Sequence, residues 1–480
     1  MPPGRFVREL MALVGRRNVL WEDYDLRLYE YDGSVDKARP QAVVLPESAE
    51  QVADVVKACH RYGVPFTPRG GGTGLSGGAL PVEGGVLISL VKMARILEVD
   101  LPNLRAVVEP GLVNLHLSQA IAEHGMYYVP DPSSQKACTI GGNVGENAGG
   151  PHTLLYGVTA NHVLGLEVVT PEGEIVQVGS KALDLPGYDL TGILVGSEGT
   201  LGIATKITVR IVPLPEAVKT LLAIFRDVES ASATVSDVIG SGIVPAAIEM
   251  MDKLAIKAVE AAYHAGYPED AGAVLLIEVD GLREGLDEQA AAIEAIARSH
   301  GASNVRVAQT AEERELLWAG RKGAFGAMGR LSPEYYVVDG VVPRTKLPGV
   351  LAAIADVSTR YGFPIANVFH AGDGNLHPLI LFDGTSQNEV ERVKEAGAEI
   401  MRICVEAGGV LSGEHGIGLE KMGLMPLLFS DQDMAAMLRL KAAFDPQGRC
   451  NPGKVFPTPG RCAEVRSRPP SSKMSGIGWL

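Results

Sequence analysis

Two short glycine-rich segments carry the residues best suited to chemistry. VFHAGDGNLHPL contains His370 and His377, and GEHG contains Glu414 and His415. Two histidines, a glutamate and a spare histidine suit a divalent metal, because three protein ligands hold the ion and leave a position for a substrate oxygen. The alternative is a pair of polar turns whose histidines are incidental, since glycine, aspartate and asparagine are typical of turns. The two segments alone do not decide between these readings.

A glycine loop, PRGGGTGLSGGAL, raises a different possibility. Gly72, Gly74 and Gly77 satisfy the pattern GxGxxG, and Asp100 follows at roughly the distance of the ribose-binding acid in a nicotinamide-binding Rossmann unit. That pattern opens a helix whose N-terminus faces the pyrophosphate, whereas Pro81 and further glycines lead here to the strand-like GVLISL. A glycine-rich turn between strands can still bind a pyrophosphate through successive backbone N–H groups. A plain surface turn is the alternative.

Two further segments share this composition, PDPSSQKACTIGGNVGENAGG at residues 130–150 and GSEGTLGI at residues 196–203. Strand and helix patterns alternate around all three loops, which predicts a sheet covered by helices. In QAVVLPESAEQVADVVKACHRYG a strand precedes a helix that begins at Ser48, with Gln51 at capping-box spacing, and ends at Gly63.

A second alternating pattern begins at about residue 220 and contains the histidine segment. Within it, Ser386 and Glu389 have the spacing of another capping box, which predicts a helix that ends at Gly408. Two prolines interrupt the pattern in VPLPEA, residues 212–217, and this interruption indicates a boundary between domains.

Composition bounds the class of protein. A chain of 480 residues, 46% hydrophobic and 21% charged, with 57 glycines, is typical of a globular enzyme with two or three domains. A net charge of −14 disfavours nucleic acid or an anionic membrane as partner, because phosphate recognition needs concentrated Lys and Arg. No apolar run is long enough for a signal peptide or a membrane span, which predicts a soluble cytoplasmic protein. The five cysteines lack CxxC spacing, so redox chemistry requires a bound cofactor.

Taken together, the three glycine loops resemble the FAD-binding domain of the vanillyl-alcohol oxidase, or p-cresol methylhydroxylase (PCMH), superfamily. The resemblance extends over almost the whole chain, through EMMDKLAIKA, WAGRKGAFGAMGRLSPEYY, FHAGDGNLHPLILFD, GEHGIGLEK and FDPQGRCNPGK. It is greatest to the FAD-linked subunit of bacterial glycolate oxidase and to D-lactate and D-2-hydroxyglutarate dehydrogenases. It implies an α+β fold, with a PCMH-type FAD-binding domain of two αβ subdomains and a C-terminal substrate domain built on a ferredoxin-like antiparallel sheet.

The organisation that this resemblance implies has five parts. They are an N-terminal helical segment at 1–37, the FAD-binding domain at 38–215, the substrate-binding domain at 216–445, a segment at 446–457 that returns to the flavin, and a flexible tail at 458–480.

The resemblance also implies which residues contact FAD. They are Pro68, Arg69, Gly70, Gly71, Gly72, Thr73, Gly74, Ser76, Gly77, Pro130, Asp131, Ser133, Ser134, Gly141, Gly142, Asn143, Gly145, Asn147, Ala148, Gly149, Glu198, Gly202, Ile203 and Asn451. Some superfamily members attach the flavin covalently through a histidine just after the Arg-x-Gly-Gly turn. Here that position is Thr73, so we expect FAD that is not covalently bound.

In the relatives that contain a metal, the matching residues have defined roles. Carried over, His370, His377 and Glu414 bind the ion, Zn or Mn, and His415 is the base that takes the hydroxyl proton while hydride passes to flavin N5. Arg321 matches the arginine that binds the substrate carboxylate, with an ordinary surface arginine as the alternative.

For two residues between the histidines, Asp373 and Asn375, the sequence gives less support for a role in the site. Asn375 is a candidate for contact with the substrate, as is His370 through the metal site. A turn is the expected role of Asp373.

Where the 2-hydroxyglutarate enzymes have further polar residues after the arginine that matches Arg321 to hold a second carboxylate, the sequence is RKGAFGAMGRL, with Phe325 and Ala327 in the neighbourhood. A small, apolar pocket favours oxidation of a short D-2-hydroxy acid, glycolate or D-lactate, to the 2-oxo acid. A D-2-hydroxyglutarate-type dehydrogenase, another enzyme of the superfamily and a non-catalytic FAD-binding assembly subunit are the alternatives.

The resemblance implies partners as well. Electrons would pass from the flavin to an iron–sulfur subunit, a quinone or a cytochrome, and a second subunit with an FAD domain belongs to the glycolate oxidase complex. The chain has no iron–sulfur cysteines of its own, so it needs such an acceptor. Contact with the inner membrane would come through a partner subunit.

Overall fold

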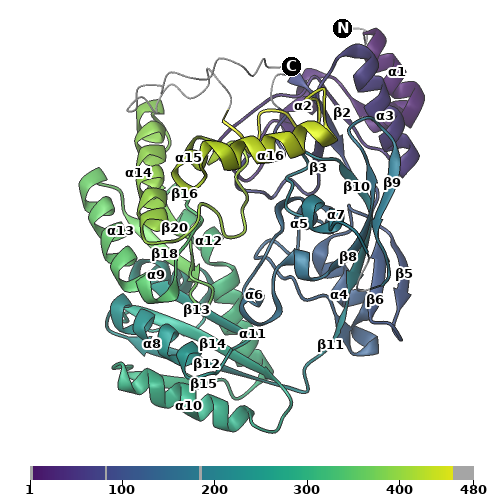
Figure 1. Ribbon diagram of the computed structural model, residues 1–480. Coiled ribbons are helices and arrows are strands. Elements are labelled where there is room, and N and C mark those ends of the chain that lie inside the picture. The colour runs from purple at the N-terminus through teal and green to yellow at the C-terminus, as the bar shows by residue number, and fades with distance from the viewer. Residues whose placement is uncertain (1–3, 82–83, 183–185, 458–480) are drawn as a thin grey trace.

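A computed structural model of the chain describes residues 4–81, 84–182 and 186–457. Two parts lie side by side, an N-terminal part in purple and blue and a C-terminal part in teal and green (Figure 1). The flexible tail predicted at 458–480 lies outside the described residues. Within the described residues, no helix combines the length and apolar character that crossing a membrane requires.

The first subdomain is a four-stranded sheet in the order β1-β2-β4-β3. Its strands are β1 (Val19–Leu20), β2 (Ala42–Val44), β3 (Phe66–Arg69) and β4 (Val86–Ser89), and the last three are parallel. Helices α1 (Arg5–Val14) and α3 (Ala49–Tyr62) pack against it, while α2 (Asp23–Leu26) precedes β2. The described residues 70–81 after β3 contain no α-helix, so the glycine pattern does not open the helix that a Rossmann unit requires, as predicted.

Helix α3 begins and ends where the sequence predicts. Ser48 Oγ accepts a hydrogen bond from the N–H of Gln51, and Gly63 adopts the left-handed conformation, with φ +68°. In a capping box the Gln51 side chain would accept from the N–H of Ser48. Here Gln51 Oε1 accepts instead from the N–H of Glu47, one residue earlier.

The second subdomain is an antiparallel five-stranded sheet in the order β5-β6-β10-β8-β9. Its strands are β5 (Ile96–Asp100), β6 (Arg105–Val108), β8 (Val163–Val169), β9 (Ile175–Gly179) and β10 (Ile203–Arg210). Short helices accompany it, namely α4 (Asn114–Ile121), α5 (Ile140–Glu146), α6 (Thr153–Tyr156) and α7 (Leu190–Leu194). The glycine-rich stretch 130–150 is therefore not a loop throughout. Thr139 caps α5 by accepting from the N–H of Gly142, and this cap offsets the low helix propensity of glycine.

The C-terminal part is built on a nine-stranded sheet, with neighbours in the order β15-β12-β14-β13-β18-β19-β17 and with β20 and β16 paired beside β18. Every strand pair in it is antiparallel, as the resemblance implies. The strands are β12 (Ala217–Phe225), β13 (Ala247–Asp252), β14 (Ala273–Gly281), β15 (Asn304–Val307), β16 (Glu334–Val337), β17 (Gly340–Val341), β18 (Ile365–His370), β19 (Asn375–Leu376) and β20 (Pro378–Phe382). A short ladder of β7 (Met126–Tyr127) with β11 (Val212–Pro213) precedes β12.

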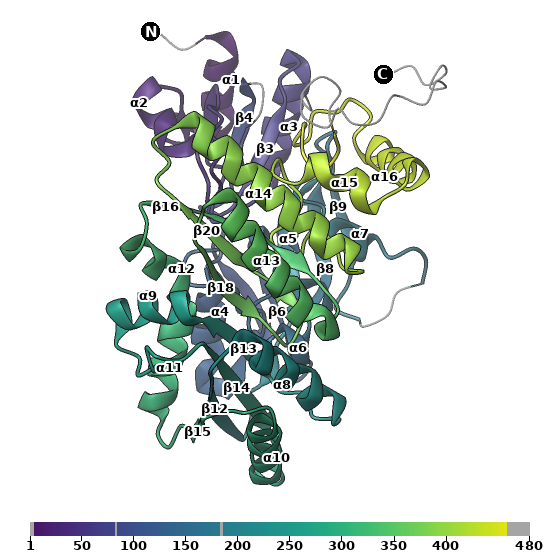
Figure 2. The ribbon, with the colours of Figure 1, turned by 90° about the vertical axis from the view of Figure 1, so that its left-hand side faces the viewer.

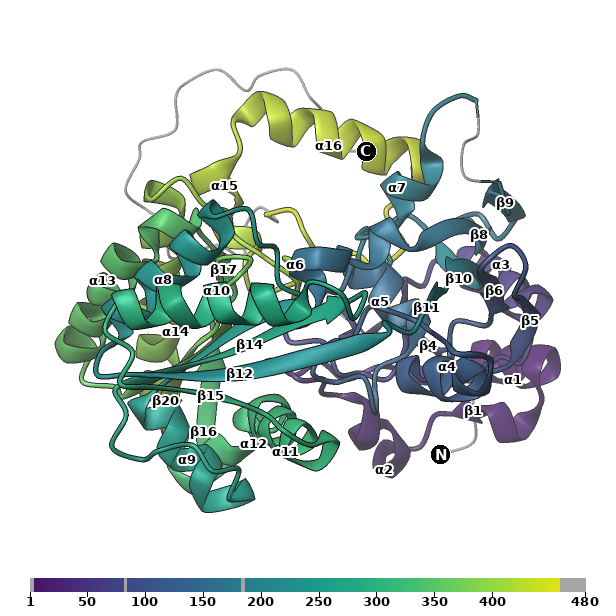
Figure 3. The ribbon, with the colours of Figure 1, turned by 90° about the horizontal axis from the view of Figure 1, so that it is seen from below.

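Helices cover both faces of the large sheet, as Figure 3 shows from below. One face packs against α8 (Val228–Gly240), α10 (Leu286–Ser299), α13 (Leu347–Tyr361) and α14 (Gln387–Glu406). The other packs against α9 (Lys253–Tyr263), α11 (Ala311–Lys322) and α12 (Ala324–Ala327). Burial of apolar side chains on both faces is the main force that holds the strands, and the residues they carry, in place.

Helix α14 lies along the outside of this domain beside α13 (Figure 2). The capping-box prediction at its start is wrong, because the Ser386 side chain makes no capping hydrogen bond. The Ser386 carbonyl instead accepts from the N–H of Glu389 at 3.0 Å.

After α15 (Met425–Leu428) and α16 (Asp431–Phe444), the chain returns to the N-terminal part. There the N–H of Asn451 donates to the carbonyl of Phe66 on β3 at 2.8 Å.

Candidate active site

A tight hairpin between β18 and β19 brings the two histidines together. His370 ends β18 and pairs with Asn375 at the start of β19, and His377 follows that strand. Gly374 makes the turn with φ +73°, and the N–H of Asp373 donates to the His370 carbonyl, which fits the turn role expected of Asp373. Both histidines are almost completely buried.

The GEHG turn faces this hairpin and is held by one buried carboxylate. Asp339 accepts hydrogen bonds from the N–H groups of Gly413, Glu414 and His415, at 3.1, 3.3 and 3.0 Å. A Cβ on Gly413 would lie 2.2 Å from Asn375 Nδ2, so only glycine allows the turn to approach the hairpin this closely.

The predicted metal ligands converge on one point. Glu414 Oε1 lies 3.2 Å from Nε2 of His370 and 3.2 Å from Nε2 of His377. One ligand atom from each of the three residues lies within 4.8 Å of the others. The ring of His415 stacks on that of His377, with centroids 4.9 Å apart and planes at 6°.

The electrostatics of the cluster fit a cation. Burial alone would lower the pKa of His370, but the carboxylates of Glu249 and Glu414 raise it to about 10. Burial would raise the pKa of Glu414, and the two histidines instead hold it well below its ordinary value. A proton on His370 supplies positive charge beside the Glu249 and Glu414 carboxylates. A divalent ion bound at Nε2 would supply positive charge at the same place, so the donor set fits a metal.

His415 differs from its neighbours in charge state. Burial lowers the pKa of its imidazole to about 4, although the nearby Asp339 carboxylate opposes this shift. Nδ1 of His415 makes no hydrogen bond within the described chain. The ring is therefore neutral at pH 7, with Nδ1 buried 4.0 Å from Asp339 Oδ2.

Arg321 lies at the end of α11 and is 2% exposed, so it is not an ordinary surface arginine. Its Nη2 forms an ion pair with Glu249 Oε2 at 2.5 Å, while neither Nη2 nor Nε meets the geometry of a hydrogen bond to any described residue. Lys322, beside it in sequence, bonds to Asp131 at 2.9 Å instead. Arg321 thus offers a buried positive charge with a free donor.

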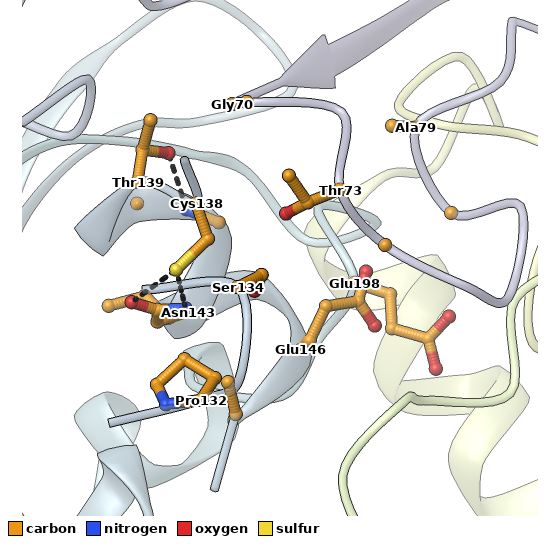
Figure 4. Close-up of a pocket in the computed structure, with 18 of the residues that line it drawn as sticks. Gly70, Thr73, Ala79, Pro132, Ser134, Cys138, Thr139, Asn143, Glu146 and Glu198 are labelled. Carbon is orange, nitrogen blue, oxygen red and sulfur yellow. Dashed lines mark hydrogen bonds between the residues drawn. The ribbon is translucent and has the colours of Figure 1, made fainter. Parts of the chain in front are cut away.

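One cavity of about 370 Å³ joins the glycine loops to this cluster, since Arg321, His370, His377, Glu414 and His415 all line it. Figure 4 shows part of its other wall, with Gly70 and Thr73 of the first loop opposite Thr139 and Asn143 of the second. The predicted FAD contacts that line the cavity are Pro68, Arg69, Gly70, Gly71, Gly72, Thr73, Gly74, Ser133, Ser134, Gly141, Gly142, Asn143, Gly145, Ala148, Glu198, Gly202 and Ile203.

The glycines of the first loop are required by close packing. A Cβ on Gly70 would lie 2.3 Å from Thr139 Oγ1, and one on Gly71 would lie 2.5 Å from the carbonyl oxygen of Ala137. The loop therefore presents backbone rather than side chains to the cavity, which fits the binding of an extended cofactor with a pyrophosphate.

Seven predicted FAD contacts do not line this cavity, namely Ser76, Gly77, Pro130, Asp131, Asn147, Gly149 and Asn451. Asn451 connects two of the loops instead, because its Nδ2 donates to the carbonyls of Gly78 and Glu198 at 3.0 and 2.8 Å. Asp131 lines a second cavity and bonds to His152 at 2.9 Å, and its bond to Lys322, also at 2.9 Å, crosses the contact between the two parts of the chain. Asn375 also does not line the first cavity, and its amide lies against Gly413.

Sequence analysis missed two carboxylates that support the site, Glu249 in EMMD and Asp339 in VVDG. Both are fully buried, and Asp339 also forms an ion pair with buried Lys421 at 2.8 Å. Neither lies near the histidines in sequence, so only the pairing of strands reveals them.

Comparison with known proteins gives concordant results. Residues 40–179 match the family described as "FAD binding domain", and residues 214–455 match "FAD linked oxidases, C-terminal domain". The chain is 51% identical to the glycolate oxidase subunit GlcD of Escherichia coli (strain K12), over 95% of this chain and 92% of the relative. It is 35% identical to the D-lactate dehydrogenase of Anaerostipes hadrus, over 87% of this chain and 90% of the relative. The fold is similar to that of p-cresol methylhydroxylase, with a TM-score of 0.80 and 19% identity over 94% of this chain and 96% of that structure, which confirms the predicted PCMH-type fold.

Proposed function

The chain belongs to the FAD-linked oxidase family, and from this premise we propose that it oxidises a short D-2-hydroxy acid, glycolate or D-lactate, to the 2-oxo acid. The observation that carries the proposal is the single cavity lined by the glycine loops at one side and by Arg321, His415 and the His370–His377–Glu414 cluster at the other. A substrate bound there would lie between the residues that would hold FAD and the proposed base.

His415 is the proposed base. Oxidation of a 2-hydroxy acid removes a proton from the hydroxyl group and a hydride from the same carbon. Bound FAD accepts the hydride, whereas the proton needs a neutral acceptor of the protein's own. The His415 ring lines the cavity and is neutral at pH 7, and its stacking on His377 fixes its orientation. Nε2 is the proposed acceptor, because Nδ1 is buried 4.0 Å from Asp339 Oδ2.

Arg321 is proposed to bind the substrate carboxylate. Its guanidinium lines the cavity and stays charged at every relevant pH, and burial strengthens a contact with a carboxylate by excluding water.

His370, His377 and Glu414 are the proposed ligands of a divalent ion, Zn or Mn. The ion would lower the pKa of the substrate hydroxyl and so make the proton easier for His415 to remove.

The surroundings of Arg321 favour a monocarboxylate. Phe325 lines the cavity and contacts the His377 ring edge-on, with centroids 5.8 Å apart. Lys322 also lines the cavity, but Asp131 holds its ammonium group. Ala327 packs in the core beside α9 and does not line the cavity. A second substrate carboxylate would therefore meet an aromatic ring rather than an unpaired cation, which argues against D-2-hydroxyglutarate.

We also propose that FAD is held without a covalent bond. Thr73 lines the cavity at the position where some superfamily members have a histidine linked to the flavin. Acid precipitation should therefore release all the flavin into the supernatant, and flavin that remained with the pellet would contradict this.

The chain is proposed to act as a subunit, because the E. coli relative is named as one. Electrons from the reduced flavin would then pass to a partner subunit with an iron–sulfur centre, to a quinone or to a cytochrome.

Anaerobic mixing with glycolate or D-lactate tests the function. The absorbance of oxidised flavin should disappear within a time on the order of seconds, since enzyme turnover is typically faster than about 1 per second. D-2-Hydroxyglutarate should reduce the flavin far more slowly than glycolate or D-lactate does. Persistence of the oxidised flavin with every short 2-hydroxy acid would refute the proposal and favour a non-catalytic subunit.

A further inference from the structure

Glu249 lies where the proposed metal ligands meet the proposed substrate arginine. It belongs to β13, which neighbours β18, and the strand register places it directly opposite His370. Its carboxylate oxygens lie 2.8 and 3.0 Å from His370 Nδ1. Arg321 reaches the same carboxylate from the end of α11, with Nη2 2.5 Å from Oε2. One fully buried carboxylate therefore contacts both halves of the site.

These contacts determine what each partner presents to the cavity. Because Nδ1 of His370 donates to Glu249, Nε2 is the nitrogen that faces Glu414 and a metal. The Glu249 carboxylate also supplies the counter-charge that a buried guanidinium requires. Since Glu249 pairs with Nη2, and Nε is buried without a partner among the described residues, Nη1 is the donor left for a ligand in the cavity that Arg321 lines.

We propose that Glu249 is a positioning residue that orients His370 toward the metal and Arg321 toward the substrate carboxylate. It does not line the cavity, so it acts through these two side chains. The inference rests on the proposed function, because it assigns a partner to two residues of that site. Its distinctive consequence is that one substitution weakens two different binding steps, of the ion and of the organic acid.

Glu249→Gln is the test, because the amide keeps the size of the side chain and an acceptor for His370 but removes the negative charge. Glu278→Gln is a matched control. Glu278 is buried on the neighbouring strand β14 and also contacts a histidine and an arginine, with His152 at 3.3 Å and Arg314 at 2.7 Å. It lines the second cavity and not the first.

Two measurements on the FAD-loaded protein separate positioning from general stability. The first is the dissociation constant for Zn²⁺ or Mn²⁺ titrated into protein stripped with EDTA. We expect Glu249→Gln to raise it about 10- to 100-fold. The second is KM for glycolate or D-lactate, which should rise about tenfold or more because Arg321 loses its buried ion-pair partner. With ion and substrate saturating, kcat should stay near the wild-type value, since Glu249 touches no reacting atom.

The control decides the interpretation. Glu278→Gln should lower the melting temperature but leave metal affinity and KM unchanged. A Glu249→Gln variant that bound ion and substrate as tightly as this control would overturn the proposal. If Glu249→Gln does not fold, Glu249→Asp takes its place, because aspartate keeps the charge but has a shorter side chain. Wild-type affinities of this variant for ion and substrate would also refute the proposal. A wild-type protein that bound neither ion nor 2-hydroxy acid would refute the proposed function instead, before any variant is compared.

Discussion

Replacing His415 by alanine separates the proposed proton transfer from binding. The side chain of His415 makes no hydrogen bond in the described chain, whereas its backbone N–H, which donates to Asp339, remains after the substitution. The GEHG turn should therefore keep its position, and Glu414 its place beside His370 and His377. Loss of a general base costs about 10²- to 10⁴-fold in rate. At about 1.4 kcal/mol for each factor of ten, the barrier to flavin reduction should rise by about 3 to 5 kcal/mol.

The assay is anaerobic stopped-flow reduction of the flavin by glycolate or D-lactate, together with flavin and metal content. His162→Ala is the control, because His162 is also buried but bonds to the Tyr156 carbonyl at 3.0 Å and lines neither cavity. We expect His415→Ala to retain FAD and metal and to lose the fast reduction, while His162→Ala reduces at the wild-type rate. A His415→Ala protein that reduced its flavin as fast as the wild type would refute the assignment of the base.

Three further predictions concern the ion, the domain contact and the GEHG turn. Treatment with EDTA should abolish substrate-driven flavin reduction and Zn²⁺ or Mn²⁺ should restore it; full activity after metal removal, checked by elemental analysis, would contradict the metal site. Burial alone would lower the pKa of His152, but Asp131 and Glu278 raise it from 6.5 to about 10, so the stability it contributes is complete below pH 6.5 and is lost as the pH rises toward 10. The melting temperature of His152→Gln should therefore decrease less between pH 6.5 and pH 10 than that of the wild type. An equal decrease in both proteins would exclude a contribution of His152 to stability. Asp339→Asn leaves the buried Lys421 ammonium without its counter-charge and should lower the free energy of unfolding by about 3 to 5 kcal/mol, measured with denaturant; additional replacement of Lys421 by methionine should recover most of the loss, and a double variant no more stable than the single one would disprove the pairing.

Local sequence signals were sufficient for much of the fold. The helix from Ser48 to Gly63 could be predicted because a side-chain cap and a left-handed glycine act over a few residues. The same reasoning failed at Ser386, where the expected spacing is present but the hydroxyl group does not make the bond. It also missed the helix within residues 130–150, since a run of glycines concealed the cap at Thr139.

The sequence by itself determined the chemical inventory of the site, because the histidines, Glu414 and Arg321 stand in short motifs that can be read without a fold. Only the tertiary structure decided how these groups are supported and how far the cofactor cavity extends. Glu249 meets His370 through the register of two strands that are separated by more than a hundred residues, whereas Asp339 reaches the GEHG turn from the short segment between β16 and β17. Packing also gives Asp131 and Asn451 protein partners that the motifs did not indicate, while their contact with FAD stays a prediction. Such contacts form where elements pack, and neither composition nor spacing along the chain encodes them locally.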